Sequence, residues 1–345
     1  MAFALSESNA VGYLLGEGLI SPRQAGSASA RELGGGVSNI VVRVDFPDTS
    51  DNVVIKQSLP RLRVEQEWLA DQARIHREAA ALRYLDGALP SSALPSVVHE
   101  DPNHFLFVMT AAEQPRTWKD DLLSGLIDTR VATEVGRLLA AMHQHSAVAG
   151  EAMPPELREF ADQRCFVQLR IDPYHRATAL AHPDLSDEIA AEAQAMLDCR
   201  LCLVHGDYSP KNVIVSPTDR GPAAFLLDFE VVHLGNPVFD LAFMLNHLTL
   251  KAIHRPDLAS QFNEAGIAFW SVYCSNAETF AAEPMQLQFQ TIRQLGVLLL
   301  ARIDGKSPAE YITTDAQRSA ARHLARTILA EEIRSISDLH QALLS

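Results

Sequence analysis

Two acidic residues and an amide stand beside apolar segments in the second half of the chain. Asp207 and Asn212 lie five positions apart in the stretch HGDYSPKNVIV, which joins two apolar runs. Such a loop can direct a carboxylate and an amide oxygen to one point. Phosphoryl transfer uses this pair, because an acid orients the acceptor hydroxyl and an oxygen ligand holds Mg²⁺. We therefore predict that Asp207 is catalytic and that Asn212 is a metal ligand.

A second acidic motif follows sixteen residues after Asn212. The stretch LLDFE puts Asp228 at the end of an apolar run and Glu230 two residues further on. A carboxylate at a strand end is exposed at the sheet edge and suits a hard cation. A lone acid of this kind is usually an ordinary turn residue, but the joint pattern is much rarer. We predict that Asp228 and Glu230 complete the magnesium site.

A glycine-rich turn between two extended segments marks the first part of the chain, in ELGGGVSNIVVRV. Glycines allow backbone N–H groups to approach phosphates closely. A strand follows this turn, so it is neither a Walker A motif nor a dinucleotide fingerprint. We predict nucleotide contacts from Gly34, Gly36, Ser38 and Asn39.

Lys56 lies inside the apolar run VVIKQ, where a buried ammonium needs a partner. Glu78, on the next predicted helix, is the natural one. A strand lysine held by a helix glutamate and contacting nucleotide phosphates is the arrangement of kinases. The alternative is a surface lysine on an edge strand, but the complete order of motifs favours the functional interpretation.

The elements that carry these residues divide the 345-residue chain into two parts, which its length also suggests. We expect an α+β fold with a small β-rich N-terminal lobe, 1–110, and a larger, mainly helical C-terminal lobe, 111–345. The first lobe would hold short helices within 1–26, strands over 30–46, 52–58, 97–100 and 104–109, and a helix over 70–85. The second would hold helices over 131–143, 186–199, 238–250, 286–302, 315–330 and 331–344, with short strands at 201–204, 213–215 and 225–227.

Composition limits the partners. The formal net charge of −14 argues against nucleic acid and against an anionic membrane surface. It does not exclude a phosphorylated ligand, because a few local cations outweigh net charge. The apolar run 295–301 is far shorter than the roughly 20 residues that span a bilayer. With four cysteines and no signal-peptide pattern, we expect a reduced, cytoplasmic protein.

The motifs resemble the aminoglycoside phosphotransferase and choline kinase superfamily, which has the protein-kinase-like two-lobe fold. HGDYSPKN, DFE and the segment GNPVFDL at 235–241 carry this resemblance. The N-terminal half is more similar to methylthioribose kinase, through IKQSLP at 55–60, Trp68 and DQARIHRE at 71–78. The resemblance implies an ATP- and Mg²⁺-dependent kinase with a small-molecule hydroxyl acceptor.

The resemblance also implies roles for residues that spacing alone does not assign. ATP would lie between the lobes, with Met109 to Ala111 supplying backbone contacts to adenine. Trp68 would shape the acceptor pocket. Arg302 is the one cation that remains where methylthioribose kinases grip the sugar with paired arginines; the alternative is an ordinary cation at the C-terminal end of a helix, which the helix dipole favours. Asp240 would brace the catalytic loop.

Three readings of the function stay open at this point. The first is a kinase of a sugar-like metabolite resembling methylthioribose. The second is an antibiotic, choline or homoserine-type kinase, which Asn212 favours because methylthioribose kinases usually have serine there. The third is a pseudokinase, against which the intact set of Lys56, Asp207, Asn212 and Asp228 speaks. A homodimer is compatible with each of them.

Overall fold

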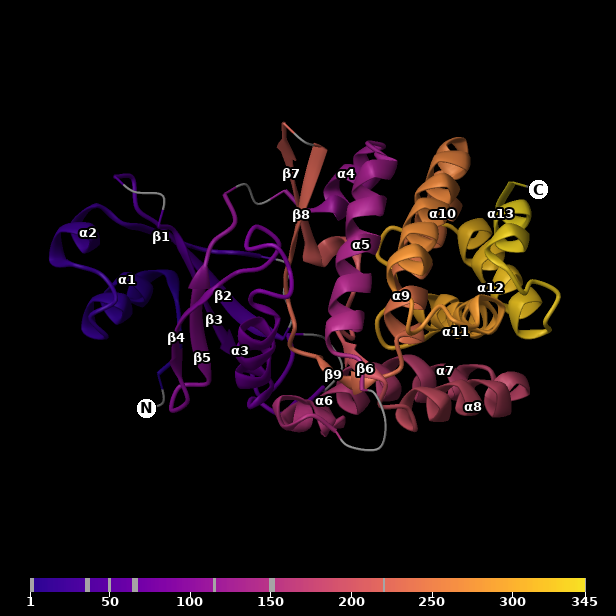
Figure 1. Cartoon of the computed structure of the whole chain (residues 1–345), viewed down its shortest axis with the longest axis horizontal. Coiled ribbons are helices and arrows are strands. Elements are labelled where there is room, and N and C mark those ends of the chain that lie inside the picture. Colours follow the sequence, from indigo (N-terminus) through magenta and orange to yellow (C-terminus); the bar gives the residue numbers. More distant parts are fainter. Residues whose placement is uncertain are drawn as a thin grey trace. The chain divides into compact units, whose positions relative to one another are not determined.

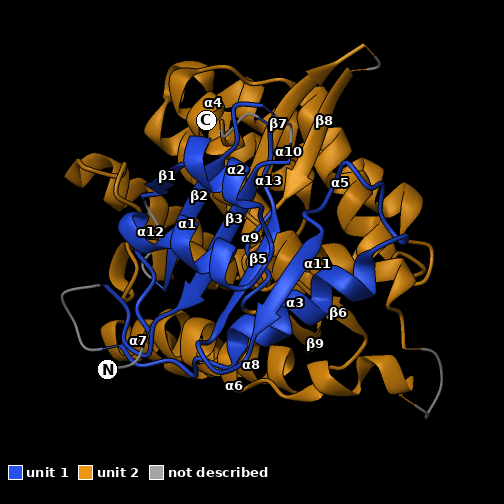
Figure 2. Cartoon of the chain, turned by 90° about the vertical axis from the view of Figure 1, so that its left-hand side faces the viewer, with its two compact units in different colours: residues 1–115, 227–230 blue, residues 116–226, 231–345 orange. Residues whose placement is uncertain are grey.

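The computed structural model describes residues 3–34, 38–48, 51–63, 68–113, 116–148, 153–219 and 221–344. The chain forms two compact units, shown in different colours in Figure 2. Unit 1 comprises residues 1–115 and 227–230, and unit 2 comprises 116–226 and 231–345. The segment that carries Asp228 and Glu230 therefore belongs to unit 1, although the sequence division assigns it to the C-terminal lobe.

Unit 1 is built on a five-stranded antiparallel sheet with the strand order β1-β2-β3-β5-β4. Valine and isoleucine dominate β2 and β3, as the pleated surface of a buried sheet favours. The elements are α1 (Glu7–Gly16), α2 (Pro22–Ser27), β1 (Ser29–Glu32), β2 (Asn39–Asp45), β3 (Val53–Ser58), α3 (Arg74–Leu85), β4 (Val97–Asp101) and β5 (Leu106–Thr110).

The core of unit 1 packs α1 against the sheet through Leu14, Val42 and Ile55, which are fully buried. Helix α3 buries Ile75 and Leu82. It begins four residues later than the sequence predicts, because the carboxylate of Asp71 accepts the N–H of residue 73 and forms a turn instead.

Unit 2 is mainly helical and contains two small antiparallel sheets, β6–β9 and β7–β8. Its elements are α4 (Trp118–Ser124), α5 (Thr129–His145), η1 (Pro155–Ala161), α6 (Arg164–Phe166), η2 (Val167–Arg176), α7 (Ala177–Ala181), η3 (Pro183–Leu185), α8 (Ser186–Leu197), β6 (Cys202–Val204), η4 (Pro210–Asn212), β7 (Val213–Thr218), β8 (Gly221–Leu226), β9 (His233–Gly235), α9 (Val238–His254), η5 (Pro256–Leu258), α10 (Ala259–Asn276), α11 (Pro284–Asp304), α12 (Asp315–Leu329) and α13 (Ile336–Leu344).

Helix α9 contacts α10, α11 and α12, which are drawn beside it in Figure 1. Nearly all of α9 is buried. The sequence pattern predicts most of these helices, but it does not predict α4, α10 or the helical run from η1 to η3. Within that run, η2 is a π-helix that contains Pro173, so its apolar positions do not follow the α-helical period.

Among the helices that the structure describes, none combines the length and the apolar character needed to cross a membrane.

Candidate active site

Lys56 lies in the middle of β3 and is almost fully buried. Its Nζ donates to both carboxylate oxygens of Glu78 on α3, at 2.9 and 2.7 Å, and forms an ion pair with Asp228. Burial lowers the pKa of Lys56, but the charges of Asp228 and Glu78 outweigh burial and raise the pKa above its ordinary value. The predicted pair of Lys56 and Glu78 is therefore present, and its ammonium keeps its charge.

Glu230 is buried and receives hydrogen bonds from three side chains of unit 1. Ser38 Oγ donates at 2.6 Å, Asn39 Nδ2 at 2.9 Å and Arg74 Nε at 3.0 Å. The fully enclosed Arg74 side chain also donates to the carbonyls of Ser38 and Leu59. Both oxygens of Glu230 are thus used within the protein. The role of Glu230 as a metal ligand stays a prediction; the hydrogen bonds in this structure join Glu230 to the segment that follows the glycine-rich turn.

Asp228 differs from Glu230 in both backbone and exposure. Its φ of 69° lies in the left-handed region, which costs a non-glycine residue about 1–3 kcal/mol and persists where surrounding structure enforces it. Its side chain is 23% exposed, against 7% for Glu230. A partly exposed carboxylate suits a hard cation such as Mg²⁺. Of the two predicted carboxylate ligands, Asp228 therefore fits the metal.

Asp207 and Asn212 lie in unit 2, on the loop between β6 and β7. Asn212 Nδ2 donates to the carboxylate and to the carbonyl of Asp207, at 2.9 Å each. Arg170 Nη2 lies 3.0 Å from Oδ1 of the same carboxylate, and Lys211 Nζ lies 2.9 Å from Oδ2. Both hydrogen bonds use the amide nitrogen of Asn212, whereas the predicted metal ligand is its amide oxygen.

Asp240, at the start of α9, anchors the backbone of the loop that carries Asp207. Its carboxylate accepts the backbone N–H groups of His205 at 2.7 Å and Gly206 at 2.9 Å, and His143 Nε2 lies 3.2 Å away. Gly206 has a φ of 75°, and a Cβ there would lie 2.9 Å from the carbonyl oxygen of Val231. Only glycine fits this position. The bracing role expected of Asp240 is confirmed by these hydrogen bonds.

The residues predicted to contact the nucleotide through their backbone differ in burial and in hydrogen bonding. Met109 is buried in β5, between β3 and β4. The N–H of Ala111 donates to the carbonyl of Asn52 at 2.9 Å, so this donor is already used. Gly34 is exposed, and a Cβ there would meet no atom within 4 Å. Gly36 lies outside the described residues.

The two residues predicted to contact the acceptor lie in different units. Trp68, in unit 1, is half-buried, and its carbonyl accepts the N–H of Leu62 at 2.9 Å. Arg302, near the end of α11 in unit 2, is only 8% exposed. Its Nη1 donates to Ser307 Oγ at 2.8 Å and to the hydroxyl of Tyr174 at 3.4 Å. Arg302 is therefore an interior residue and not an exposed helix cap.

Two arginines that contact the predicted site residues were not predicted from the sequence. Arg74 precedes Glu78 by four residues, so both lie on one face of α3, and this spacing could have indicated it. Arg170 donates Nε to the carbonyl of Gly206 at 2.6 Å, in addition to its pairing with Asp207. It lies on the π-helix η2, far from Asp207 in sequence, and no motif marks it.

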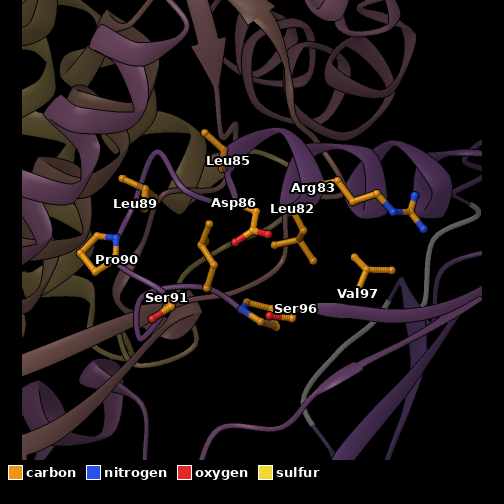
Figure 3. Close-up of a pocket in the computed structure, with 11 residues that line it drawn as sticks. Leu82, Arg83, Leu85, Asp86, Leu89, Pro90, Ser91, Ser96 and Val97 are labelled. Atoms are coloured by element: carbon orange, nitrogen blue, oxygen red, sulfur yellow. The ribbon is translucent and has the colours of Figure 1, made fainter.

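A pocket of about 100 Å³ lies in unit 1 between α3 and β4, where Figure 3 shows its lining side chains. Arg83, Asp86 and Ser96 are among them. It is small beside the roughly 300–1,000 Å³ of ordinary ligand pockets. None of the predicted site residues lines it, so we assign it no part in the chemistry.

The buried lysine–glutamate pair and the aspartate–asparagine loop are parts of enzymes that transfer phosphoryl groups. The sequence model of the phosphotransferase enzyme family matches residues 29–273, which is more than half of the chain. The protein therefore belongs to the phosphotransferase enzyme family. The predicted enzyme class is confirmed.

Curated relatives include the methylthioribose kinases of two bacteria. The chain is 26% identical to that of Cronobacter sakazakii over 277 residues, which is 72% of this chain and 66% of that protein. It is 25% identical to that of Geobacillus kaustophilus over 326 residues, which is 82% of this chain and 78% of that protein. The predicted similarity to methylthioribose kinase is confirmed.

Solved structures share the fold at low identity. An ethanolamine kinase of Plasmodium vivax matches with a TM-score of 0.56 at 14% identity, covering 96% of this chain and 93% of that one. An amicoumacin kinase in complex with AMP-PNP, Ca²⁺ and Ami also matches with a TM-score of 0.56 at 14% identity, covering 96% of each chain. The predicted α+β, protein-kinase-like fold is confirmed.

Proposed function

We propose that this protein is an ATP- and Mg²⁺-dependent small-molecule kinase that transfers the γ-phosphate to a hydroxyl of a sugar-like metabolite. The observation that carries the proposal is the Asp207 loop, in which a buried carboxylate is fixed by Asn212 and by two cations. The methylthioribose kinases among the relatives support a sugar-like acceptor.

The nucleotide is assigned to the residues of unit 1 around Lys56. The ammonium of Lys56, held by Glu78, would bind the α- and β-phosphates. Ser38 and Asn39 are held by Glu230 and would present the backbone of the glycine-rich segment to the phosphates. The exposed backbone at Gly34 supports the same role.

Magnesium is assigned to Asp228 and Asn212, which offer a carboxylate oxygen and an amide oxygen. Mg²⁺ usually takes one or two protein oxygens and completes its shell with phosphates and water, so a large cluster of protein ligands is not needed. When bound, the ion neutralises charge on the phosphates.

Asp207 is assigned to the acceptor. Its carboxylate would accept a hydrogen bond from the acceptor hydroxyl and orient the oxygen for in-line attack. A bond forms between that oxygen and Pγ, the bond between Pγ and the bridging oxygen of ADP breaks, and the hydroxyl proton passes to the carboxylate. Positioning of this kind and charge neutralisation supply most of the catalysis in phosphoryl transfer.

A coupled ADP-release assay with sugars, amino alcohols and aminoglycosides as acceptors tests the proposal. We expect Mg²⁺-dependent ADP release with a sugar-like acceptor and a loss of about 10²–10⁴-fold in Asp207→Asn. Asp315→Asn is the matched control, because the Asp315 side chain is 97% exposed. Calorimetry with Mg-ATP and thermal melting check that Asp207→Asn still folds and binds nucleotide. Turnover of Asp207→Asn close to that of Asp315→Asn would remove Asp207 from the mechanism.

A further inference from the structure

Unit 2 contains three cations that interact electrostatically with one another; two of them are buried, and the third is partly exposed and paired with a carboxylate. This cationic cluster consists of Lys119 on α4, Lys251 on α9 and Arg302 on α11, with His247 and Tyr311 packed beside them. Lys251 is 1% exposed, and Arg302 and His247 are each 8% exposed. Burying a charge is costly unless it is paired, so such a cluster requires a reason.

Lys251 is the least compensated member of the cationic cluster. Its Nζ donates to the carbonyl of His247 in the preceding turn of its own helix, at 3.3 Å, and lies 5.0 Å from the ring centre of Tyr311. Among the described residues, no carboxylate lies within ion-pair distance of this ammonium. Burial, with the charges of Lys119 and Arg302 adding to it, lowers the pKa of Lys251 to about 7.

Two further polar atoms of the cationic cluster are buried without a hydrogen-bond partner in the described residues. They are Nε of Arg302 and the hydroxyl of Tyr311. Native proteins leave few buried donors unsatisfied, and each one calls for a ligand or another explanation. A guanidinium N–H, a phenol and an ammonium are each donors of the kind that bind an oxyanion.

The cationic cluster is connected to the predicted catalytic carboxylate within unit 2. Arg170 pairs with Asp207, and its guanidinium lies 5.7 Å from the ring centre of Tyr174. The Tyr174 hydroxyl in turn accepts from Nη1 of Arg302 at 3.4 Å. A continuous set of side-chain contacts therefore runs from Asp207 to Arg302.

The edge of the cationic cluster reaches solvent. Lys119 forms an ion pair with Glu310, and their side chains are 30% and 61% exposed. The cluster would repel the positive charge of choline or of an aminoglycoside.

We propose that the acceptor carries an oxyanion group, a carboxylate or a phosphate, and that the cationic cluster binds this group while Asp207 orients the hydroxyl. The inference rests on the proposed kinase function and specifies the chemical class of its substrate. The oxyanion would receive hydrogen bonds from Lys251, from Nε of Arg302 and from the hydroxyl of Tyr311.

The first test compares matched acceptors that differ in charge. Glycerate, glycerol 3-phosphate, glycerol and 3-aminopropane-1,2-diol are offered with Mg-ATP, and ADP release is measured. We expect kcat/KM for glycerate or glycerol 3-phosphate to exceed that for glycerol by at least about tenfold, as one charge-assisted hydrogen bond would produce. The better of the two anions tells carboxylate from phosphate. A preference for glycerol or for the amine would overturn the inference and leave the kinase assignment intact.

The second test measures binding without catalysis, and it decides the question if none of the four compounds is phosphorylated. Inorganic phosphate is titrated while the melting temperature is followed. We expect it to stabilise the wild type and Lys306→Met, whose exposed lysine is the matched control, but not Lys251→Met. Absence of a phosphate-dependent shift in the wild type, or an equal shift in Lys251→Met, would overturn the inference.

Two variants separate ligand binding from a structural role. Lys251→Met removes an uncompensated buried charge, so we expect its melting temperature without ligand to equal or exceed that of the wild type. Tyr311→Phe keeps the ring beneath Lys251 and removes only the unpartnered hydroxyl. It should fold normally and bind the oxyanion about tenfold more weakly. A Tyr311→Phe protein with unchanged oxyanion affinity and a Lys251→Met protein with a lowered melting temperature would show a structural role.

Failure of the inference and failure of the proposed function remain distinguishable. If phosphate binds in a Lys251-dependent way but no Mg-ATP binding or turnover occurs, the kinase assignment fails while the oxyanion site stands. If neutral or cationic acceptors are phosphorylated preferentially, the kinase assignment stands while the oxyanion site fails.

Discussion

Replacing Glu230 by glutamine tests whether this residue organises unit 1 or ligates the metal. Glutamine keeps the size of the side chain but removes its charge and turns one acceptor oxygen into a donor nitrogen. If the amide oxygen stays on Asn39 Nδ2 and Arg74 Nε, at 2.9 and 3.0 Å, the amide nitrogen faces Ser38 Oγ, whose hydroxyl loses the acceptor that it now has at 2.6 Å. In either orientation the enclosed Arg74 guanidinium loses its counter-charge.

Breaking a buried ion pair by removing one partner costs about 3–5 kcal/mol. We therefore expect Glu230→Gln to lower the free energy of unfolding of unit 1 by that amount, or its melting temperature by roughly 10–20 °C. Glu32→Gln is the matched control in unit 1, because the ion pair of Glu32 with Arg63 is largely exposed. Exposed pairs contribute about 0–1 kcal/mol.

Chemical denaturation of Glu230→Gln, Arg74→Met and the double variant measures the coupling between the two residues. The double variant should lose less stability than the sum of the single variants, by at least about 1.5 kcal/mol. Calorimetry with ATP, with and without Mg²⁺, gives the second readout, in which the folded Glu230→Gln protein should keep its Mg²⁺ dependence. Unchanged stability together with a lost Mg²⁺ dependence would refute the reasoning and make Glu230 a metal ligand.

Further predictions concern the remaining site residues. Asp207→Asn should nearly abolish turnover while Mg-ATP still binds, and intact turnover in steady-state kinetics would contradict its role. Asp228→Asn should weaken ATP binding with Mg²⁺ more than without it; equal affinities under the two conditions in calorimetry would point to another ligand. Lys56→Met should raise KM for ATP and lower kcat, and Glu78→Gln should have a milder effect of the same kind. The effects of the two substitutions should be non-additive in the double variant; simple additivity would show that the pair does not act as a unit. Lys251 should make stability depend on pH, because its pKa in the folded protein is about 7. Between about pH 7 and 10 the folded protein has released this proton and the unfolded chain still holds it. The free energy of unfolding of the wild type therefore increases as the pH rises in this range. The excess stability of Lys251→Met over the wild type should therefore shrink by about 1.4 kcal/mol per pH unit in this range, and denaturation curves showing a pH-independent difference would contradict the lowered pKa.

The sequence predicts those parts of the site that a local chemical rule specifies. A lysine inside an apolar strand requires an acidic partner, and Glu78 is indeed that partner. The short loop from Asp207 to Asn212 joins its two polar groups over five positions, and the structure shows their hydrogen bond. In the first case a chemical requirement identifies a partner 22 positions away, and in the second the two groups are near neighbours in sequence.

The sequence does not predict contacts that depend on burial of a residue type usually found at the surface. Arg74 and Lys251 belong to types that are seldom fully buried, so composition gives no reason to place them inside. The predicted helix over 238–250 ends just before Lys251, whereas α9 continues to His254 and buries this lysine. For Glu230, the sequence identifies an acid in the right motif but not the three donors that surround it.

Local features of the sequence also explain why the helices η2 and α10 were not predicted. Pro173 interrupts the α-helical period within η2, which hides the helix that carries Arg170. In α10, Phe262, Phe269 and Tyr273 are buried at helical spacing, but polar residues and a glycine between them weaken the pattern. Both segments lie in unit 2.

The transferred phosphoryl group itself provides the most direct test of the kinase assignment. ATP labelled in its γ-phosphate is incubated with the wild-type protein, Mg²⁺ and each acceptor, and the products are analysed by mass spectrometry. We predict that one labelled phosphoryl group appears on an acceptor hydroxyl for each ADP formed, and that Asp207→Asn gives neither product. Label found only in inorganic phosphate, or no Mg²⁺-dependent conversion of ATP with any acceptor, would contradict the assignment as a small-molecule kinase.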